Sequence, residues 1–489
     1  MATVTTGSTG QTAATKTGSS SGVAAATGSP AAQAAIEAIL ADLAARQAAL
    51  TGVRPARDGG AATMESWLKR VADSRGRGAY YPYVGSGLGR GALVELVDGS
   101  VKWDMICGIG AHAFGHGDAA IVRAGLEAAT SDLCMQGNLQ FNGDSIQFAE
   151  LLLAEAGRTS RLRHCFLSNS GCMVNESALK ICQQKTGGAP RVLAFDDCFM
   201  GRSTAMTQIG DGPDYRQGVA LNALVDYLPF YDAGQGEAST QATLRALRRF
   251  LARYPKQHGA LVMELIQGEG GFNMAPRSFF TAICETARSA GVPVWLDEVQ
   301  TFGRTERMFH YEALGLGELV DVVTIGKLPQ ACALLFTEAM NPRAGLLSGT
   351  FTASTSAFRA GLAALTRLRD GGFYGPDGSN ARLHAAFRTH VDALMKRHGA
   401  WFPPALDGEG RAIASLVGGT GGMMRFTPFG GNKEKVQKAL HTMFANGVIA
   451  FSCGHGPYHI RFLPPIGVMK PQEFDPVFEI VERSLAEVA

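Results

Sequence analysis

The stretch that decides the fold is Val294-Trp-Leu-Asp-Glu-Val-Gln300, an apolar run that ends in polar residues. Such a short run is consistent with a buried strand of a parallel sheet. A second apolar run, Val322-Val-Thr-Ile325, follows and leads directly into Gly326 and Lys327. In an open α/β sheet, ligands bind beyond the carboxyl ends of the strands. The two runs therefore predict that Asp297 and Lys327 face one crevice.

The chain on either side of this stretch alternates short apolar runs with amphipathic segments from about residue 115 to 345. Strands are expected at residues 164–168, 191–195 and 260–266, and helices at 174–184 and 279–290. This alternation predicts a mostly parallel sheet covered by helices. After Gly349 the pattern becomes mixed, with helices at 357–368 and 471–489. We expect an N-terminal tail (1–28), a helical arm with a small-domain segment (29–110), a large domain (111–345) and a C-terminal small domain (346–489).

The N-terminal tail consists almost entirely of Ala, Thr, Gly and Ser. Such a composition cannot bury enough apolar surface to form a core, so residues 1–28 are expected to be disordered. A transit peptide is the alternative, but the tail lacks arginine and an amphipathic pattern. Ser29-Pro30 predicts the start of a helix, because Ser is a good N-cap and Pro is favoured at the first helical position.

The composition is that of a globular protein: 46% of the 489 residues are hydrophobic, 18% are charged, and the net charge is +2. The small net charge gives no reason to expect a nucleic-acid partner. No apolar segment is long enough to predict a membrane span, and no secretory signal is apparent at the start. Nine scattered cysteines without a Cys-x-x-Cys pair predict reduced thiols, and hence a cytoplasmic protein without a structural zinc.

Two further motifs suggest ligand sites but lack the required context. Gly85-Ser-Gly-Leu-Gly-Arg-Gly91 has neither nucleotide-loop spacing nor a position between a strand and a helix. It precedes a hairpin that should turn at Asp98-Gly99. His112 and His116 have i, i+4 spacing, but they lie in a glycine-rich loop without the glutamate of a zinc helix. No metal is therefore expected there.

The segments Asp297-Glu-Val-Gln-Thr-Phe-Gly-Arg-Thr305 and Thr324-Ile-Gly-Lys327 resemble those of class III pyridoxal-phosphate aminotransferases, the ornithine, acetylornithine and 4-aminobutyrate type. The resemblance extends from about residue 80 to the C-terminus. Gly326-Lys-Leu-Pro-Gln-Ala-Cys332 is similar to the lysine 6-aminotransferase branch. The resemblance implies an α/β fold, the fold-type I pyridoxal-phosphate-dependent transferase, with a large helix-covered sheet and a smaller α/β domain. It also implies a homodimer or larger oligomer with active sites at the subunit interface.

The same resemblance implies pyridoxal 5′-phosphate (PLP) as the cofactor, with Lys327 and Asp297 as catalytic residues. Lys327 would hold the cofactor and Asp297 would keep its ring nitrogen protonated. The phosphate would lie at the start of a helix after Asn169, because backbone N–H groups there bind anions. Cys172 replaces the threonine usual in the family. The implied cofactor-binding residues are Ser170, Gly171, Cys172, Phe199, Asp297, Gln300, Lys327 and Thr350.

Three charged residues are implied to bind substrates. Arg202, in Phe199-Met-Gly-Arg202, matches an arginine that holds a substrate carboxylate as a bidentate partner. Glu269, in Glu264-Leu-Ile-Gln-Gly-Glu-Gly-Gly271, matches a gating glutamate, and Arg461 matches its partner. Paired with Glu269, Arg461 would let an amine-bearing chain end enter. Released from it, Arg461 would bind the carboxylate of 2-oxoglutarate.

The implied function is transfer of the terminal amino group of an amino acid to 2-oxoglutarate. Lysine, ornithine, N-acetylornithine and 4-aminobutyrate all suit such a site, and the product would be a semialdehyde together with glutamate. An aminomutase or decarboxylase with the same fold is the alternative enzyme. A silent fold with a binding or regulatory role is the alternative of a different class. The replacements at Cys172, Met173 and Met200 leave this last hypothesis open.

Overall fold

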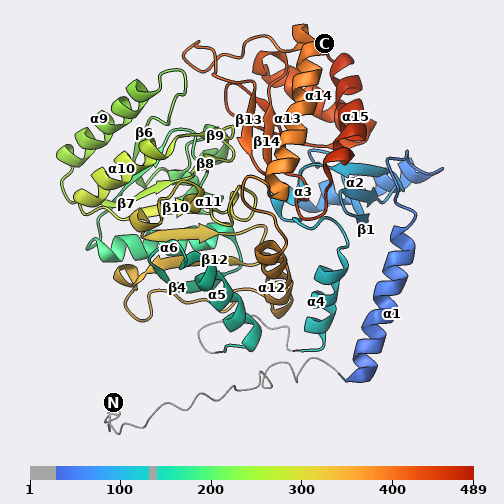
Figure 1. The fold of residues 1–489 in the computed structure, drawn as a ribbon, viewed down its shortest axis with the longest axis horizontal. Helices are drawn as coiled ribbons and strands as arrows, with labels where there is room; N and C mark the ends of the chain where they lie inside the picture. Colours follow the sequence, from blue (N-terminus) through green and yellow to red (C-terminus); the bar gives the residue numbers. More distant parts are fainter. Residues whose placement is uncertain (1–28, 132–139) are drawn as a thin grey trace.

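A seven-stranded sheet forms the centre of the structure, a computed structural model that describes residues 29–131 and 140–489 (Figure 1). Its strands lie in the order β4 (Leu162–Ser168), β12 (Cys332–Thr337), β11 (Val322–Ile325), β10 (Val294–Asp297), β7 (His258–Met263), β5 (Arg191–Phe195) and β6 (Leu224–Leu228). β12 runs antiparallel to both of its neighbours, and the other strand pairs are parallel. The predicted mostly parallel sheet is confirmed.

Helices cover both faces of this sheet, and alternate side chains of each strand enter different cores. On β5, Val192 and Ala194 belong to the core on the side of α6 (Gly171–Lys185). Leu193 and Phe195 belong to the core on the other side. The latter core also contains apolar residues of α5 (Gly143–Ala156), α9 (Glu237–Arg253) and α10 (Arg277–Ser289). Burial on both faces explains why the central strands β7, β10 and β11 are mostly apolar runs.

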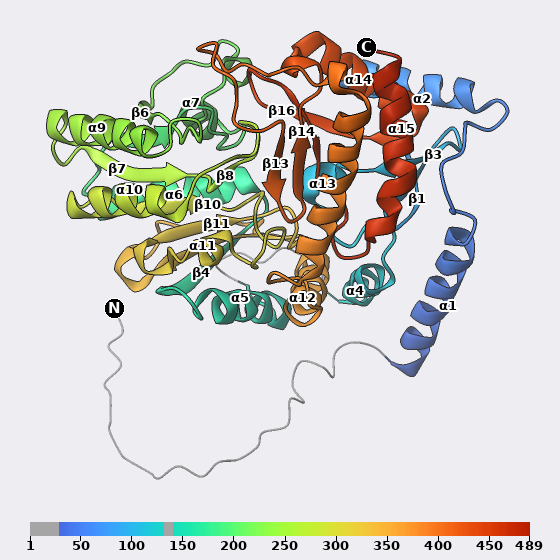
Figure 2. The ribbon, with the colours of Figure 1, turned by 45° about the horizontal axis from the view of Figure 1, so that its top comes forward.

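A smaller body contains segments from the two ends of the chain. One four-stranded sheet joins β1 (Gly85–Arg90), β2 (Leu93–Leu96) and β3 (Val101–Asp104) to β15 (Val448–Ile449), and the other has the order β13 (Val417–Thr420), β14 (Met423–Phe426), β17 (His459–Phe462), β16 (Phe451–Cys453). Figure 2 shows α2 (Gly60–Arg75) beside α14 (Lys433–Asn446) and α15 (Phe474–Ala486), with α13 (Ser379–Arg397) on the same body. The Tyr81 hydroxyl donates to the Ala450 carbonyl oxygen, 369 residues later in the chain. The two ends of the chain are therefore parts of one structural unit.

Most of the predicted elements are present. The helix α1 (Pro30–Gln47) begins where expected, with the Ser29 hydroxyl accepting the Ala32 N–H at 3.3 Å, and it contacts α4 (Ala119–Ala129). The glycine-rich run is the strand β1, which pairs with β2, and the hairpin of β2 and β3 is confirmed. The helix predicted at 357–368 is present as α12, which is longer and spans Thr355–Asp370.

Two predicted boundaries were wrong. The strand predicted at 260–266 ends at Met263, because the Glu264 carboxylate accepts the Gly268 N–H and turns the chain. Ile266-Gln267 then forms a separate short strand, β8, with β9 (Asn273–Met274). The last helix begins at Phe474 because Pro471–Glu473 forms a 3₁₀ turn. The expected tail, residues 1–28, lies outside the described residues, and the proposed domain boundaries stay a prediction.

None of the helices in the described part of the chain combines the length and apolar character that a bilayer crossing requires.

Candidate active site

The ends of β10 and β11 open into one pocket of about 200 Å³. The two strands are parallel, and Asp297 is in register with Thr324, three residues before Lys327. Asp297 and Lys327 both line the pocket, as the strand-end argument predicts. Its full lining is Ser170, Gly171, Cys172, Asn175, Phe199, Met200, Gly201, Arg202, Glu264, Asp297, Val299, Gln300 and Lys327. The structure thus brings seven of the eight predicted cofactor residues, and Arg202, into one cavity.

Asp297 is a buried carboxylate without a cation in direct contact among the described residues. Its Oδ1 accepts the Val299 N–H at 2.8 Å, and its Oδ2 accepts the Asn175 side-chain N–H at 2.7 Å. Burial raises the pKa of Asp297, and these hydrogen bonds and the nearby Lys327 only partly oppose that effect. A group with a positively charged N–H placed at this carboxylate would restore its ionised form.

Lys327 lies in the left-handed backbone region, with φ of +60°. This conformation is uncommon for a residue other than glycine and is often found at functional sites. Burial lowers the pKa of Lys327, although Asp297 and Glu269 act in the opposite direction. A lysine with a lowered pKa has a larger fraction of the neutral amine, which is the form that attacks carbonyl groups.

The N-terminus of α6 forms the part of the wall predicted to bind phosphate. Ser170 caps the helix, its Oγ accepting the Met173 N–H at 3.2 Å. The first N–H groups of a helix have no partner within it, and they attract anions. A Cβ at Gly171 would lie 3.0 Å from Val299 Cγ1, so glycine is needed for this close approach. The Cys172 sulfur does not replace a threonine hydroxyl; it accepts the Arg202 backbone N–H at 2.9 Å.

Phe199 and Arg202 lie in the loop after β5, next to a third side chain, Tyr215. The Phe199 and Tyr215 rings form an edge-to-face pair with centroids 5.2 Å apart. The Arg202 guanidinium lies 4.1 Å from the Tyr215 ring centroid and 5.6 Å from that of Phe199. Within the described residues no carboxylate pairs with Arg202, so its charge remains available to an anionic ligand.

Glu269 and Arg461 form a bidentate ion pair with N–O distances of 2.7 and 3.0 Å. Arg461 is fully buried, and Glu269 is 18% exposed. Burial alone would raise the pKa of Glu269, but the Arg461 guanidinium outweighs it and lowers the pKa. The partners come from different parts of the chain, the loop after β8 and the strand β17. The pair therefore links the β8–β9 hairpin to the smaller body, near the charge of Lys327.

Two residues of the pocket wall were missed as site residues in the sequence. Asn175 donates both to Asp297 and to the Met200 carbonyl oxygen, 2.8 Å away. Glu264 accepts the N–H groups of Phe199 and Gly268, each at 2.9 Å, and burial raises its pKa to about 8. The position of Glu264 just beyond β7 follows the same rule that indicated Asp297. Asn175 gives no comparable indication in the sequence.

Thr350 is the one predicted cofactor residue that does not line the pocket. It is exposed, in the loop before α12. The resemblance assigns it to the phosphate of a partner subunit, and that role stays a prediction.

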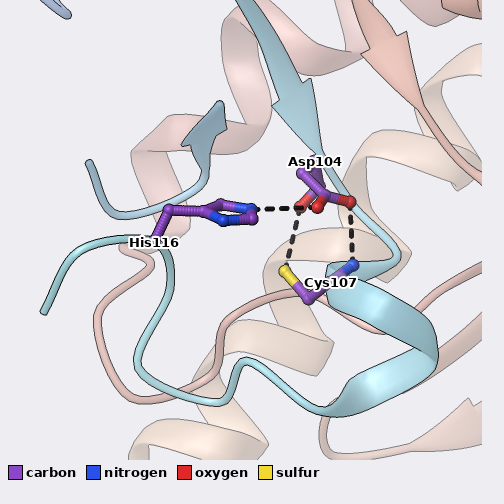
Figure 3. A group of neighbouring side chains, drawn as sticks. All are labelled: Asp104, Cys107 and His116. Atoms are coloured by element: carbon purple, nitrogen blue, oxygen red, sulfur yellow. Dashed lines mark hydrogen bonds and ion pairs between the residues drawn. The ribbon is translucent and has the colours of Figure 1, made fainter. Parts of the chain in front are cut away.

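Asp104, Cys107 and His116 form a second cluster of polar groups, within 4.8 Å of one another (Figure 3). His116 Nε2 lies 3.0 Å from Asp104 Oδ2, and the Cys107 N–H donates to Asp104 Oδ1 at 2.8 Å. The Cys107 thiol lies 3.2 Å from the Asp104 carbonyl oxygen. Burial raises the pKa of this thiol, whereas a metal binds the thiolate. We interpret the cluster as a hydrogen-bonded support for the turn at 107–110, where Cys107 and Ile109 have positive φ.

The family model described as aminotransferase class-III matches residues 83–485, most of the chain. The chain belongs to the class III aminotransferases.

Two curated relatives of this aminotransferase match it over most of their length. The 2-aminoadipate transaminase of Pseudomonas putida is 28% identical over 82% of this chain and 95% of its own. The 4-aminobutyrate aminotransferase of Mycobacterium tuberculosis is 30% identical over 82% of this chain and 90% of its own. Among solved structures, lysine aminotransferase from M. tuberculosis superposes with a TM-score of 0.74 at 21% identity, covering 86% of this chain and 100% of that one. That likeness confirms the fold-type I architecture.

The aminotransferase depends on PLP, as its class does, and the pocket fits that group. Asn175 Oδ1 and Gln300 Oε1 are buried without a hydrogen-bond partner in the described structure, and both residues line the pocket. An unpartnered buried polar atom is costly, so a polar ligand is expected to satisfy these two. The helix N-terminus suits a phosphate, and Asp297 suits the protonated ring nitrogen.

Proposed function

We propose that this aminotransferase moves the terminal amino group of an amino acid to 2-oxoglutarate, giving a semialdehyde and glutamate. The observation that carries the proposal is the Glu269–Arg461 ion pair beside a second arginine, Arg202, that has no carboxylate partner among the described residues. Arg202 can bind a substrate carboxylate directly. Arg461 can do so only after Glu269 moves away from it. This arrangement suits two substrates that carry different numbers of carboxylates near the reacting carbon.

In the proposed reaction, PLP supplies a ring that accepts the electrons released when a proton leaves the substrate carbon. Asp297 would hold the ring nitrogen in its protonated form, and Phe199, in the wall of the same pocket, would pack against the ring. Lys327 Nζ removes the proton as a general base and returns it as a general acid. Burial of Lys327 lowers its pKa and so favours the base form.

The charged residues select the substrate end that enters. Arg202 holds the distal carboxylate of the amino donor, and the Glu269–Arg461 pair presents no free positive charge near the reacting carbon. When glutamate or 2-oxoglutarate binds, Glu269 moves away and Arg461 donates hydrogen bonds to the carboxylate nearest that carbon. Lysine, ornithine, N-acetylornithine and 4-aminobutyrate are the donors of this kind to test. Relatives named for 4-aminobutyrate and acetylornithine support the choice.

We further propose that the enzyme is a homodimer or larger and acts in the cytoplasm. Exposed Thr350, outside the pocket of its own chain, supports a shared site, and the eight cysteines of the described residues are free thiols. Light scattering of the purified protein would test the oligomer. A monomer at micromolar concentration with full activity would contradict it.

The first experiment is an absorbance spectrum of the purified, PLP-loaded protein, followed by single amino donors without an acceptor. A visible band that one terminal-amino donor bleaches, and that 2-oxoglutarate restores, would support the proposal and name the donor. A band that no donor bleaches would favour a mutase, a decarboxylase or a silent fold. No band after addition of PLP would contradict the role of Lys327.

A further inference from the structure

Three side chains from separate elements form a hydrogen-bonded chain that ends beside Arg202. Tyr215 belongs to the short helix α8 (Pro213–Arg216), and His455 lies in the loop between β16 and β17. The Tyr215 hydroxyl lies 3.3 Å from His455 Nε2, and His455 Nδ1 lies 3.0 Å from Asp197 Oδ1. Asp197 follows β5 and has φ of +60°. None of these residues was predicted as part of the site.

Tyr215 packs against two residues of the pocket wall without lining the pocket itself. Its ring contacts both Phe199 and the Arg202 guanidinium. Burial raises the pKa of Tyr215 to about 12, with a further contribution from the Glu269 charge. The hydroxyl is therefore protonated at neutral pH and can donate one hydrogen bond. It lies within electrostatic range of both arginines to which substrate carboxylates are assigned, Arg202 and Arg461.

We propose that the Tyr215 hydroxyl donates a hydrogen bond to the carboxylate held by Arg202, and that the protonation of His455 controls whether it is free to do so. This inference rests on the proposed function of Arg202. It assigns Tyr215 as a specificity-determining residue for substrates with a distal carboxylate, and His455 and Asp197 as positioning residues.

The effect of His455 protonation on the Tyr215 hydroxyl follows from the hydrogen-bonding capacity of imidazole. In the neutral ring, the Nδ1–H donates to Asp197, so Nε2 accepts the Tyr215 O–H and the hydroxyl hydrogen is occupied. In the protonated ring, Nε2–H donates to the Tyr215 oxygen. The Tyr215 hydrogen is then free to donate to a substrate carboxylate.

The charges around His455 favour its protonated form. The hydrogen bond that His455 donates to Asp197 raises the pKa of His455 most, burial opposes it, and the carboxylates of Glu269 and Asp211 raise it further. Among the residues that the structure describes, Tyr215 is the other titratable group hydrogen-bonded to it. Carboxylate affinity should therefore be highest below the raised pKa of His455 and fall as pH rises through it. By linkage, bound carboxylate should raise that pKa again.

The test measures binding of glutarate, an unreactive dicarboxylate, to the PLP-loaded enzyme by calorimetry between pH 6 and 9. Wild-type enzyme should bind glutarate more weakly as pH rises. Tyr215→Phe keeps the ring contacts and removes only the hydroxyl, so its Kd at pH 6 should be about tenfold higher, the value expected for one hydrogen bond to a charged group. Its pH dependence should also be smaller.

A matched control is Tyr254→Phe. The Tyr254 ring also lies against an arginine, Arg191, at 3.7 Å, and near a histidine, His258, with centroids 6.3 Å apart. It lies at the opposite, amino-terminal end of β5 from Asp197. The Kd of the Tyr254→Phe variant for glutarate should equal that of the wild type at every pH.

His455→Ala should have the opposite effect from Tyr215→Phe. With no imidazole to occupy it, the Tyr215 hydroxyl stays free, and the Kd for glutarate should remain near its low-pH value up to pH 9. In steady-state assays, Tyr215→Phe should raise KM about tenfold for 4-aminobutyrate and leave KM for butylamine, which lacks the carboxylate, unchanged.

An unchanged Kd in Tyr215→Phe, or wild-type pH dependence in His455→Ala, would overturn the inference even if amino donors still bleach the cofactor band. Failure of every terminal-amino donor to bleach that band would contradict the proposed function instead. The two failures are distinguishable because glutarate binding requires no reaction.

Discussion

Asp226 and Asp297 are two buried aspartates of the same sheet with opposite surroundings. Asp226, in β6, accepts the Arg191 N–H groups at 2.5 and 2.7 Å and lies 2.9 Å from His258 Nε2. Burial raises the pKa of Asp226, but the Arg191 hydrogen bonds outweigh it, and the pKa is lowered. Within the described part of the chain, Asp297 receives only neutral N–H donors, and burial raises its pKa.

This difference in pairing distinguishes an aspartate that stabilises the fold, Asp226, from an aspartate of the candidate site, Asp297. The chain itself supplies the cation for Asp226, so the ionised carboxylate stabilises the fold. No residue in direct contact with Asp297 supplies one, within the described structure, so the stabilising charge must come from a ligand. A buried titratable group that its own protein leaves incompletely paired is a sound indicator of function.

The largest effect is expected for Lys327→Ala. It removes the amine proposed to hold the cofactor and to move the proton, so turnover should fall more than about 10⁴-fold. Lys256→Ala is the control, because Lys256 also has a positive φ, of 61°, but lies exposed at the other end of the sheet. Appreciable steady-state transamination by Lys327→Ala would contradict the assignment.

Asp297→Asn should lower kcat by about 10² to 10³-fold, because the amide no longer stabilises a protonated ring nitrogen. Its free energy of unfolding without PLP should be equal to that of the wild type or higher, since no cation is left unpaired. Single-turnover rates and urea unfolding of the apoenzyme would measure the two effects. A large loss of stability would show that Asp297 is structural, like Asp226.

Asp226→Asn should show the reverse pattern. Leaving the partly buried Arg191 without its anion should cost about 3 kcal/mol of unfolding free energy, with kcat nearly unchanged. Because the folded pKa of Asp226 is lowered, its contribution is fully present above the ordinary value of 3.8 and is lost as pH falls through the lowered pKa. Urea unfolding should therefore show a wild-type advantage at pH 7 that shrinks below about pH 4. An equal advantage at both pH values would refute this account.

Glu269→Gln should change specificity more than overall rate. Without the glutamate charge, Arg461 is free near the reacting carbon and should attract carboxylates there. The ratio of kcat/KM for 4-aminobutyrate to that for glutamate should fall about tenfold, the value of one charge-assisted contact. An unchanged ratio would mean that the ion pair is purely structural.

The smallest effects are expected from replacing the N-cap residues of two helices, one at the site and one away from it. Ser170 caps α6 at the site, and Ser354 caps α12, its Oγ accepting the Ala357 N–H at 3.1 Å. Replacing either with Ala should cost about 1 kcal/mol of stability. Only Ser170→Ala should also weaken PLP binding, measured by fluorescence titration of the apoenzyme. Equal PLP affinity in both variants would remove Ser170 from the phosphate site.

The sequence predicted the parts of this enzyme that depend on local pattern. Apolar runs gave the central strands, and polar residues at their ends indicated Asp297 and Lys327. The antiparallel strand β12, inserted between β4 and β11, was not predicted, because an apolar run does not indicate its direction or neighbours. The contact of Tyr215 with His455, 240 residues apart, was likewise missed, because it depends on packing between distant elements.

The pairing of β3 with β15 has a consequence for biosynthesis. At roughly 5 to 20 residues per second, the ribosome needs about 20 to 70 s to synthesise the chain between β3, which ends at Asp104, and β15, which begins at Val448. During that time the edge of β3 has no partner, and an open edge can pair with other chains. The emerging chain is therefore a natural client for chaperones, although the central sheet needs nothing beyond residue 337 to complete its strands.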